Sequence, residues 1–183
     1  MLTAQVLISV IFSLIAYWLG NFNPTIHSFF VWIMWLFLDL LAAESLVVLV
    51  ASAFPNFVGA LAITAFANGL WMCVGGFLVP LPTLNVFWKY AFHYWDYQAY
   101  VFQGMLVNEF STRAYECDPV QGQNGCSCQY ASALQDQCKI AGGAVVEKYG
   151  YALDHQRQWV GIMVAIIFGY RLAGWLVNVL RKT

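Results

Sequence analysis

The sequence predicts an all-α integral membrane protein with four transmembrane helices, a re-entrant helical segment and a disulfide-bearing external loop. Hydrophobic residues make up 61% of the 183 residues and charged residues only 9%, whereas a soluble domain has about 25% charged residues. The apolar residues form four long runs, and four of the five cysteines lie in one polar segment. This composition excludes an ordinary soluble domain. The chain has no basic patch, so we expect no nucleic-acid partner.

The four apolar runs are predicted to cross the bilayer at about residues 2–19, 26–54, 57–79 and 159–180. A spanning helix needs about 20 apolar residues, and each run reaches or nearly reaches that length. Prolines follow each of the first three runs. Proline ends helices, so these residues mark the predicted ends of the spans. The first run has no basic flank and a poor cleavage site, so we interpret it as a true span rather than a signal peptide.

Two signals orient the chain. Arg181 and Lys182 directly follow the last run, and basic residues collect on the cytosolic side of a membrane. The polar segment 111–158 precedes that run, and it contains four cysteines: Cys117, Cys126, Cys128 and Cys138. Disulfides persist outside the cytosol. We therefore expect an extracellular cysteine loop, two cytosolic termini and a location in the plasma membrane.

The four loop cysteines admit three pairings. Cys126 and Cys128 are too close in sequence to bond each other without strain, which favours pairing each of them with Cys117 or Cys138. Two connectivities remain open. Neither these cysteines nor the histidines have the spacing of metal ligands, so we expect no metal site.

The segment 81–110 is dense in aromatic residues but is neither a span nor an ordinary loop. Tyr and Trp favour the headgroup level of a membrane. Backbone that enters a membrane must form its hydrogen bonds internally, so we predict a re-entrant segment made of a short helix or a pair of helices. Its aromatic side chains have two interpretations: a belt that anchors the fold, or the lining of a substrate exit.

Three Asp, Glu, Lys or Arg residues fall inside predicted spans: Asp39, Glu44 and Arg171. Asp39 and Glu44 are five residues apart, which places them about 140° apart around a helix, so they do not form a carboxylate pair on one face. Charged groups inside a membrane are costly and often functional. We expect pairing with a partner such as Arg171 or solvation near a helix end. A role in substrate relay is the alternative.

Several segments resemble the G subfamily of ATP-binding cassette transporters. The resemblance rests on residues 74–82 (VGGFLVPLP), 87–90 (FWKY) and 108–110 (NEF), with Tyr100 and Gly104 between them. It covers essentially the whole chain and corresponds to the second half of the type-2 membrane domain, closest to fungal-type members. One departure is Asp96-Tyr97-Gln98, where many relatives have Ser-Pro or Ile-Pro.

This resemblance implies roles for particular residues. It places a hydrophobic valve on Phe77 and Leu78, which would close the pathway by meeting the same pair of a second membrane domain. It places substrate-cavity positions near four residues of the third span: Ala65, Asn68, Gly69 and Met72. Asn108 and Glu109 form the turn of the re-entrant segment, where Glu109 caps the adjoining helix or joins a polar relay. Ordinary helix packing is the competing interpretation, and a loop cysteine can also link two protomers in relatives.

The chain contains no phosphate-binding motif G-x-x-x-x-G-K-[ST], so it has no site for nucleotide phosphates. We therefore expect it to be neither an enzyme nor a cofactor-binding chain by itself. ATP and Mg would bind a nucleotide-binding domain in a longer parent chain or on another subunit, and four helices where the family has six suggest a fragment. The predicted function is the membrane part of an ATP-driven exporter for small amphipathic or lipid-like substrates.

A four-span membrane organiser of tetraspanin-like plan is the alternative function. Such proteins also carry a cysteine-rich loop before the last span. They contain Cys-Cys-Gly in that loop, and this sequence does not. The two classes therefore differ in a motif that can be checked directly.

Overall fold

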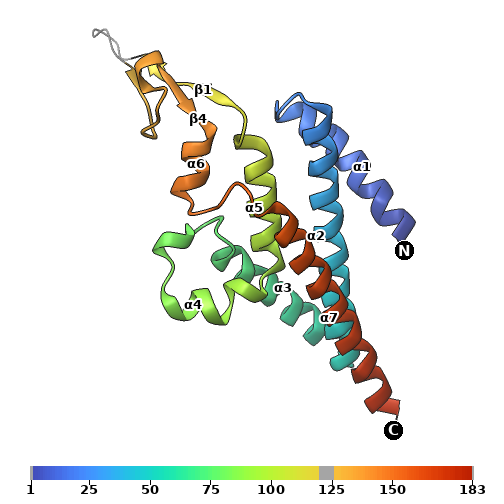
Figure 1. Ribbon diagram of the computed structural model, residues 1–183. Coiled ribbons are helices and arrows are strands. Elements are labelled where there is room, and N and C mark those ends of the chain that lie inside the picture. Colours follow the sequence, from blue (N-terminus) through green and yellow to red (C-terminus); the bar gives the residue numbers. More distant parts are fainter. Residues whose placement is uncertain (1, 120–125, 183) are drawn as a thin grey trace.

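The computed structural model describes residues 2–119 and 126–182 and is mainly helical (Figure 1). Its helices are α1 (Leu2–Leu19), α2 (Ile26–Ala53), α3 (Phe57–Val74), α4 (Val86–Ala91), α5 (Tyr97–Phe110), α6 (Gly142–Lys148) and α7 (Gln156–Lys182). Its strands are β1 (Ala114–Glu116), β2 (Asp118–Pro119), β3 (Cys126–Ser127) and β4 (Lys139–Ala141). Short 3-10 turns cover Leu81–Thr83, His93–Trp95 and Gln135–Gln137.

Three of the described helices are long and apolar enough to cross a membrane: Ile26–Ala53, Phe57–Val74 and Gln156–Arg181. They correspond to the second, third and fourth predicted spans. The first predicted span forms α1, whose apolar stretch Thr3–Leu19 is shorter than these three. A crossing by α1 therefore remains a prediction.

Helix α3 is shorter than the span predicted at 57–79, because it ends at Val74. Gly75 caps the helix, and Gly76 has a φ of +94°, a conformation that glycine adopts readily and other residues rarely. A Cβ at position 76 would lie 2.0 Å from the Tyr151 hydroxyl oxygen. The chain therefore leaves the helix at these two glycines, and residues 75–79 form a bend.

Polar side chains cap the N-terminal ends of three helices, α2, α3 and α5. The hydroxyl of Thr25 accepts a hydrogen bond from the backbone N–H of Ser28 at the start of α2. Asn56 accepts one from Val58 at the start of α3, and Asp96 accepts one from Gln98 at the start of α5. Each cap satisfies a backbone donor that has no partner inside the helix. These residues fix where α2, α3 and α5 begin.

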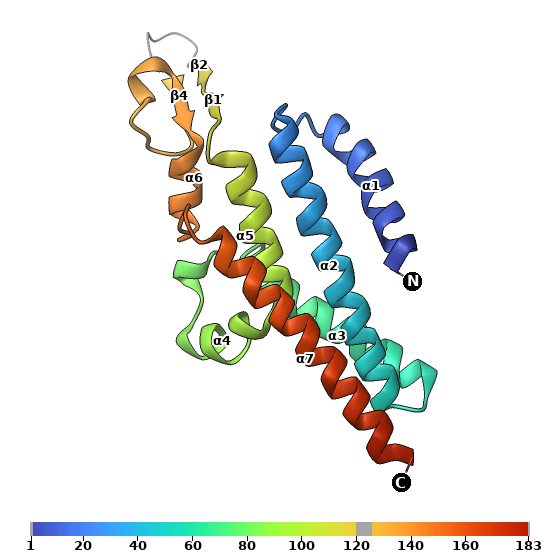
Figure 2. The same ribbon diagram turned by 45° about the vertical axis from the view of Figure 1, so that its right-hand side comes forward.

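Helix α2 is the centre of the fold, since α1, α3, α5 and α7 all pack against it. Figure 2 shows α7 running beside α2 along much of its length. The core includes the fully buried side chain of Trp35 on α2. Its indole leaves no space beside Gly104 of α5, where a Cβ would lie 2.1 Å from the ring. This glycine therefore permits α5 to approach α2 closely.

The outward faces of the long helices carry large apolar side chains. Examples on α1, α3 and α7 are Leu7, Phe57, Phe66 and Phe168, all more than half exposed. An apolar surface of this extent is unfavourable in water but suits a lipid environment. The exposure pattern therefore agrees with helices that face lipid.

The polar loop after α5 contains β-strands, which the all-α prediction did not include. Strands β1 and β4 form one antiparallel pair, and β2 and β3 form a second. Two disulfides, Cys117–Cys128 and Cys126–Cys138, hold the pairs together. The structure is thus mainly helical, as predicted, but the loop contains two short strand pairs that the all-α prediction did not include.

The loop and the chain end lie at opposite ends of the helices (Figure 1). The strands and the turn between α1 and α2 lie at one end, and the turn between α2 and α3 lies with the C-terminal end of α7 at the other. This arrangement separates the cysteine loop from the basic residues at the C-terminal end of α7.

Candidate functional site

A cavity of about 280 Å³ lies beside the end of α3, between α2, α3 and α5. Its lining is mainly apolar and comprises Asp39, Trp71, Met72, Gly75, Phe77, Gln98, Val101, Phe102 and Met105. Ligand cavities in proteins are typically apolar with a few polar groups. This cavity has that character, because Asp39 and Gln98 supply the polar groups.

The four predicted substrate-cavity positions on α3 separate into two groups. Ala65, Gly69 and Met72 are exposed, and a Cβ at Gly69 would meet nothing within 4 Å. Asn68 instead faces α5, where its Oδ1 accepts hydrogen bonds from the Tyr97 hydroxyl at 2.8 Å and from Gln98 Nε2 at 3.1 Å. In this chain Asn68 ties α3 to α5, while Met72 lines the cavity.

The predicted valve residues lie in the bend after α3 rather than in the helix itself. Phe77 and Leu78 are 54% and 56% exposed, so neither side chain is buried within the described part of the chain. The Phe77 ring meets the Phe102 ring edge-on with centroids 5.6 Å apart. The bend at Gly76 therefore places Phe77 at the rim of the cavity, and the valve role remains a prediction.

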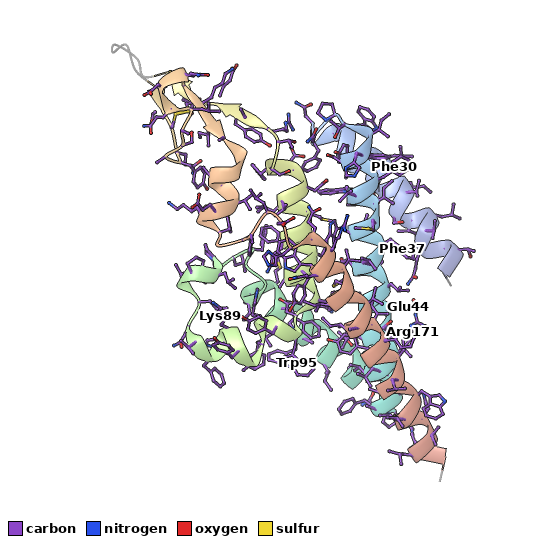
Figure 3. All side chains as sticks on the ribbon, in the orientation of Figure 1. Phe30, Phe37, Glu44, Lys89, Trp95 and Arg171 are labelled. Carbon is purple, nitrogen blue, oxygen red and sulfur yellow. A yellow bond between two sulfur atoms is a disulfide. The ribbon has the colours of Figure 1, made fainter. Side chains whose placement is uncertain are left out.

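A polar cluster joins three helices within the predicted membrane region. Arg171 of α7 donates hydrogen bonds to Glu44 at 3.3 Å and to Ser45 at 3.1 Å, both on α2. Gln5 of α1 also donates to Glu44. Figure 3 shows Glu44 and Arg171 meeting between α2 and α7. The pairing of Glu44 with Arg171 is thus present, and it compensates two charges that would be costly alone.

Asp39 is the third Asp, Glu, Lys or Arg residue of the predicted spans, and it takes no part in this cluster. It lines the cavity beside α3 and α5, while Glu44 faces α1 and α7. Among the described residues Asp39 forms no hydrogen bond or ion pair. The two carboxylates therefore serve different faces of α2, as their helical spacing predicts.

The predicted re-entrant turn forms a buried polar clasp. Glu109 is 6% exposed and accepts hydrogen bonds from the Asn23 backbone N–H at 2.8 Å, the Tyr115 hydroxyl at 3.1 Å, and Arg113. Asn108 donates to the carbonyl oxygen of Ser28 at 2.9 Å. Glu109 therefore connects the turn before α2, the end of α5 and strand β1, rather than capping a helix.

The electrostatics of this clasp affect Tyr115, which lies in the loop outside the predicted spans. Burial, together with the negative charge of Glu109, raises the pKa of Tyr115 to about 12. Its hydrogen bond to Glu109 also favours the neutral phenol, which is the form that can donate. The Arg113 guanidinium acts in the opposite direction.

The segment 81–110, where the sequence predicts a short helix or a pair of helices, contains α4, α5 and the 3-10 turns Leu81–Thr83 and His93–Trp95. His93 is buried and hydrogen-bonded to the Val74 carbonyl oxygen at 2.8 Å. Five aromatic side chains of this segment are exposed: Phe87, Trp88, Tyr90, Tyr94 and Trp95. An outward aromatic surface fits a membrane-anchoring belt. Its position in a bilayer and its part in substrate exit remain predictions.

The four loop cysteines adopt one of the two connectivities that remained open. Cys117 bonds Cys128, and Cys126 bonds Cys138. The fifth cysteine, Cys73, is a free thiol on α3. Within residues 2–119 and 126–182, no group of three His, Cys, Asp or Glu side chains is arranged to hold a metal ion.

Residues 1–110 match the family described as ABC-2 type transporter. The chain belongs to this family. The matched residues include α1 to α5 and therefore the cavity, the bend and part of the clasp, namely Asn23, Asn108 and Glu109. This membership favours the transporter interpretation over the tetraspanin-like organiser.

Relatives of this ABC-2 chain belong to the G family and include fungal proteins. ABC transporter G family member 23 of Arabidopsis thaliana is 28% identical over 96% of the chain, which covers 26% of that protein. ABC transporter G family member 1 of Petunia hybrida is 35% identical over 57% of the chain, covering 17% of that protein. ABC multidrug transporter atrA of Aspergillus oryzae is 22% identical over 96% of the chain, covering 12% of that protein. The chain thus spans about a quarter or less of these three relatives.

Sequence reasoning missed the cavity role of Asp39, although Asp39 was singled out as an intramembrane acid. The cavity lies between three helices, and Asp39, Phe77 and Gln98 come from three distant segments. No local pattern brings them together. The one available signal was the helical spacing of Asp39 and Glu44, which already placed them on different faces.

Proposed function

We propose that this ABC-2 chain forms part of the translocation pathway of an ATP-driven exporter for small amphipathic or lipid-like substrates. The observation that carries the proposal is the family match over residues 1–110. The cavity beside α3 and the exposed valve pair support it, because an apolar cavity with few polar groups suits an amphipathic molecule.

The chain has no phosphate-binding loop, so its energy source lies in a nucleotide-binding domain in the same parent chain or on another subunit. ATP and Mg would bind there. Two membrane domains would pair so that both copies of Phe77 and Leu78 meet and exclude water. The exposure of both side chains supports this arrangement.

We propose that the cysteine loop is extracellular, that both termini are cytosolic, and that the protein resides in the plasma membrane. Disulfides in the loop and the basic residues at the C-terminal end of α7 support this orientation. The turn between α2 and α3 would then face the cytosol, close to where a nucleotide-binding domain would dock.

Affinity purification through a tag after Thr183, from the membranes in which the protein occurs, tests this function. The purified complex should contain an ATPase, and its reconstituted vesicles should accumulate a fluorescent amphiphile only when ATP is supplied. The chain expressed alone should neither bind nor hydrolyse ATP. A tagged complex that lacks an ATPase, or ATP turnover by the chain alone, would contradict the proposal.

A further inference from the structure

The cavity beside α3 has an acidic character that its apolar lining does not predict. Asp39 is the one charged side chain among its lining residues, and no lysine or arginine lines it. Asp39 forms no hydrogen bond or ion pair with the described residues. An ionised side chain inside a membrane protein is costly unless it is paired. Asp39 therefore lacks the compensation that Arg171 gives to Glu44.

A second carboxylate lies against the same cavity wall. Asp96 is fully buried at the start of α5, and its Oδ1 caps the helix through Gln98. Its Oδ2 has no hydrogen-bond partner in the described part of the chain. This atom would lie 2.8 Å from a Cβ built on Gly75, which lines the cavity. Two acidic groups without full partners thus adjoin one apolar space.

The remaining walls suit a positive charge that carries apolar groups. Trp71, Phe77 and Phe102 present aromatic rings, and Met72 and Met105 add flexible thioethers. Aromatic faces attract cations, and methionine adapts its shape to different apolar ligands. An anion would meet repulsion from Asp39, and a purely polar cation would leave the apolar walls without contacts.

We propose that this cavity binds amphipathic cations, with the ligand's amine or quaternary ammonium beside Asp39 and its apolar part against Trp71 and Phe102. Phe77 lies at the rim of the same cavity, which links the binding site to the predicted valve. The statement that such cations are transported substrates rests on the proposed function. The binding of cations by this chain does not.

Equilibrium binding to the full chain in nanodiscs of uncharged phosphatidylcholine tests the inference. The probes are benzyltrimethylammonium and benzylsulfonate, which share a benzyl group and carry opposite charges. Saturation-transfer NMR reports their affinity, and empty nanodiscs correct for partitioning into lipid. Benzyltrimethylammonium should bind saturably, and benzylsulfonate should not.

Three variants locate the site. Asp39→Asn should weaken benzyltrimethylammonium binding about tenfold or more, because it removes the charge attraction in a partly buried site. Asp39→Glu keeps the charge and should retain binding within about threefold, and Trp71→Leu should cost about threefold through lost cation–π attraction. Asp154→Asn removes an exposed loop carboxylate and should leave the affinity unchanged. A shared thermal melting profile would show that the variants fold.

Unchanged binding in Asp39→Asn, or equal binding of benzylsulfonate, would overturn the inference. The inference would also be overturned if Asp154→Asn weakened binding as much as Asp39→Asn does, because the loss of affinity would then reflect the overall charge of the chain. These experiments use neither ATP nor a nucleotide-binding domain. Cation binding can therefore hold while the exporter function fails, and an active exporter whose chain does not bind the cation would refute this inference alone.

Discussion

The clasp around Glu109 offers a quantitative test of how the loop end of the fold, where the strands lie, is held. Replacing Glu109 by alanine removes the acceptor for the Asn23 N–H, the Tyr115 hydroxyl and the Arg113 guanidinium. The Asn23 donor is buried, with the residue 4% exposed, so it cannot easily bond water instead. The loss should therefore be large for a single substitution.

The magnitude follows from the burial of each partner. A hydrogen bond to a charged group contributes about 1.5–3 kcal/mol, and a buried group left without a partner adds a penalty. The Arg113 side chain is 28% exposed, so its ion pair is screened and contributes about 1 kcal/mol or less. We expect Glu109→Ala to lower the free energy of local opening by about 3 kcal/mol. This corresponds to an opening equilibrium constant that is roughly a hundredfold larger.

Hydrogen-exchange mass spectrometry of the chain in nanodiscs measures this effect. Peptides that cover residues 20–25 and 111–116 should exchange roughly a hundredfold faster in Glu109→Ala than in the parent. Glu109→Gln retains an acceptor oxygen but loses the charge, so its effect should be about tenfold. Glu116→Ala removes a neighbouring carboxylate that is exposed, and it should leave exchange unchanged.

Two outcomes would refute this reasoning. If Glu109→Ala exchanges within about threefold of the parent at residues 20–25, the clasp does not hold the turn between α1 and α2. If Glu116→Ala has the same effect as Glu109→Ala, the loss reflects the charge of the loop rather than the three hydrogen bonds.

Three further predictions concern the valve, the topology and the loop. In an assembled transporter, Phe77→Ala combined with Leu78→Ala should lower transport or raise ATP use per substrate severalfold at equal surface expression, because the apolar seal is lost; a parental coupling ratio would leave these residues with a packing role only. An impermeant thiol reagent should label the loop cysteines of reduced intact cells, while a tag after Thr183 should stay protected until permeabilisation; the reverse pattern would contradict the orientation. The pKa of Tyr115 is raised to about 12, so the unfolded chain ionises this residue first and stability should fall between about pH 10 and pH 12; Tyr115→Phe should remove that part of the pH dependence in thermal melts, and an identical profile would refute the assignment.

The sequence by itself determined the class of protein and the approximate positions of the four longest helices. Apolar runs longer than a soluble helix needs, with few charges, can be stable only in lipid or in a large core. Helix ends are marked by the side-chain caps Thr25 and Asn56 and by Pro55 between α2 and α3. Such signals are local, so they can be read from adjacent residues. The pairing of Glu44 with Arg171 was also foreseeable, because unpaired charges in a membrane are costly.

Tertiary structure decided the features that depend on distant segments. The end of α3 coincides with Gly75 and Gly76, where Gly76 has a positive φ and the Tyr151 hydroxyl leaves no room for a Cβ. The choice of one disulfide connectivity follows from the strand pairing in the loop. The cavity exists only where α2, α3 and α5 meet, and Asp39 faces it because α7 and α1 occupy the opposite side of α2. Local propensity carries no information on such contacts, since each depends on the packing of residues far apart in the chain.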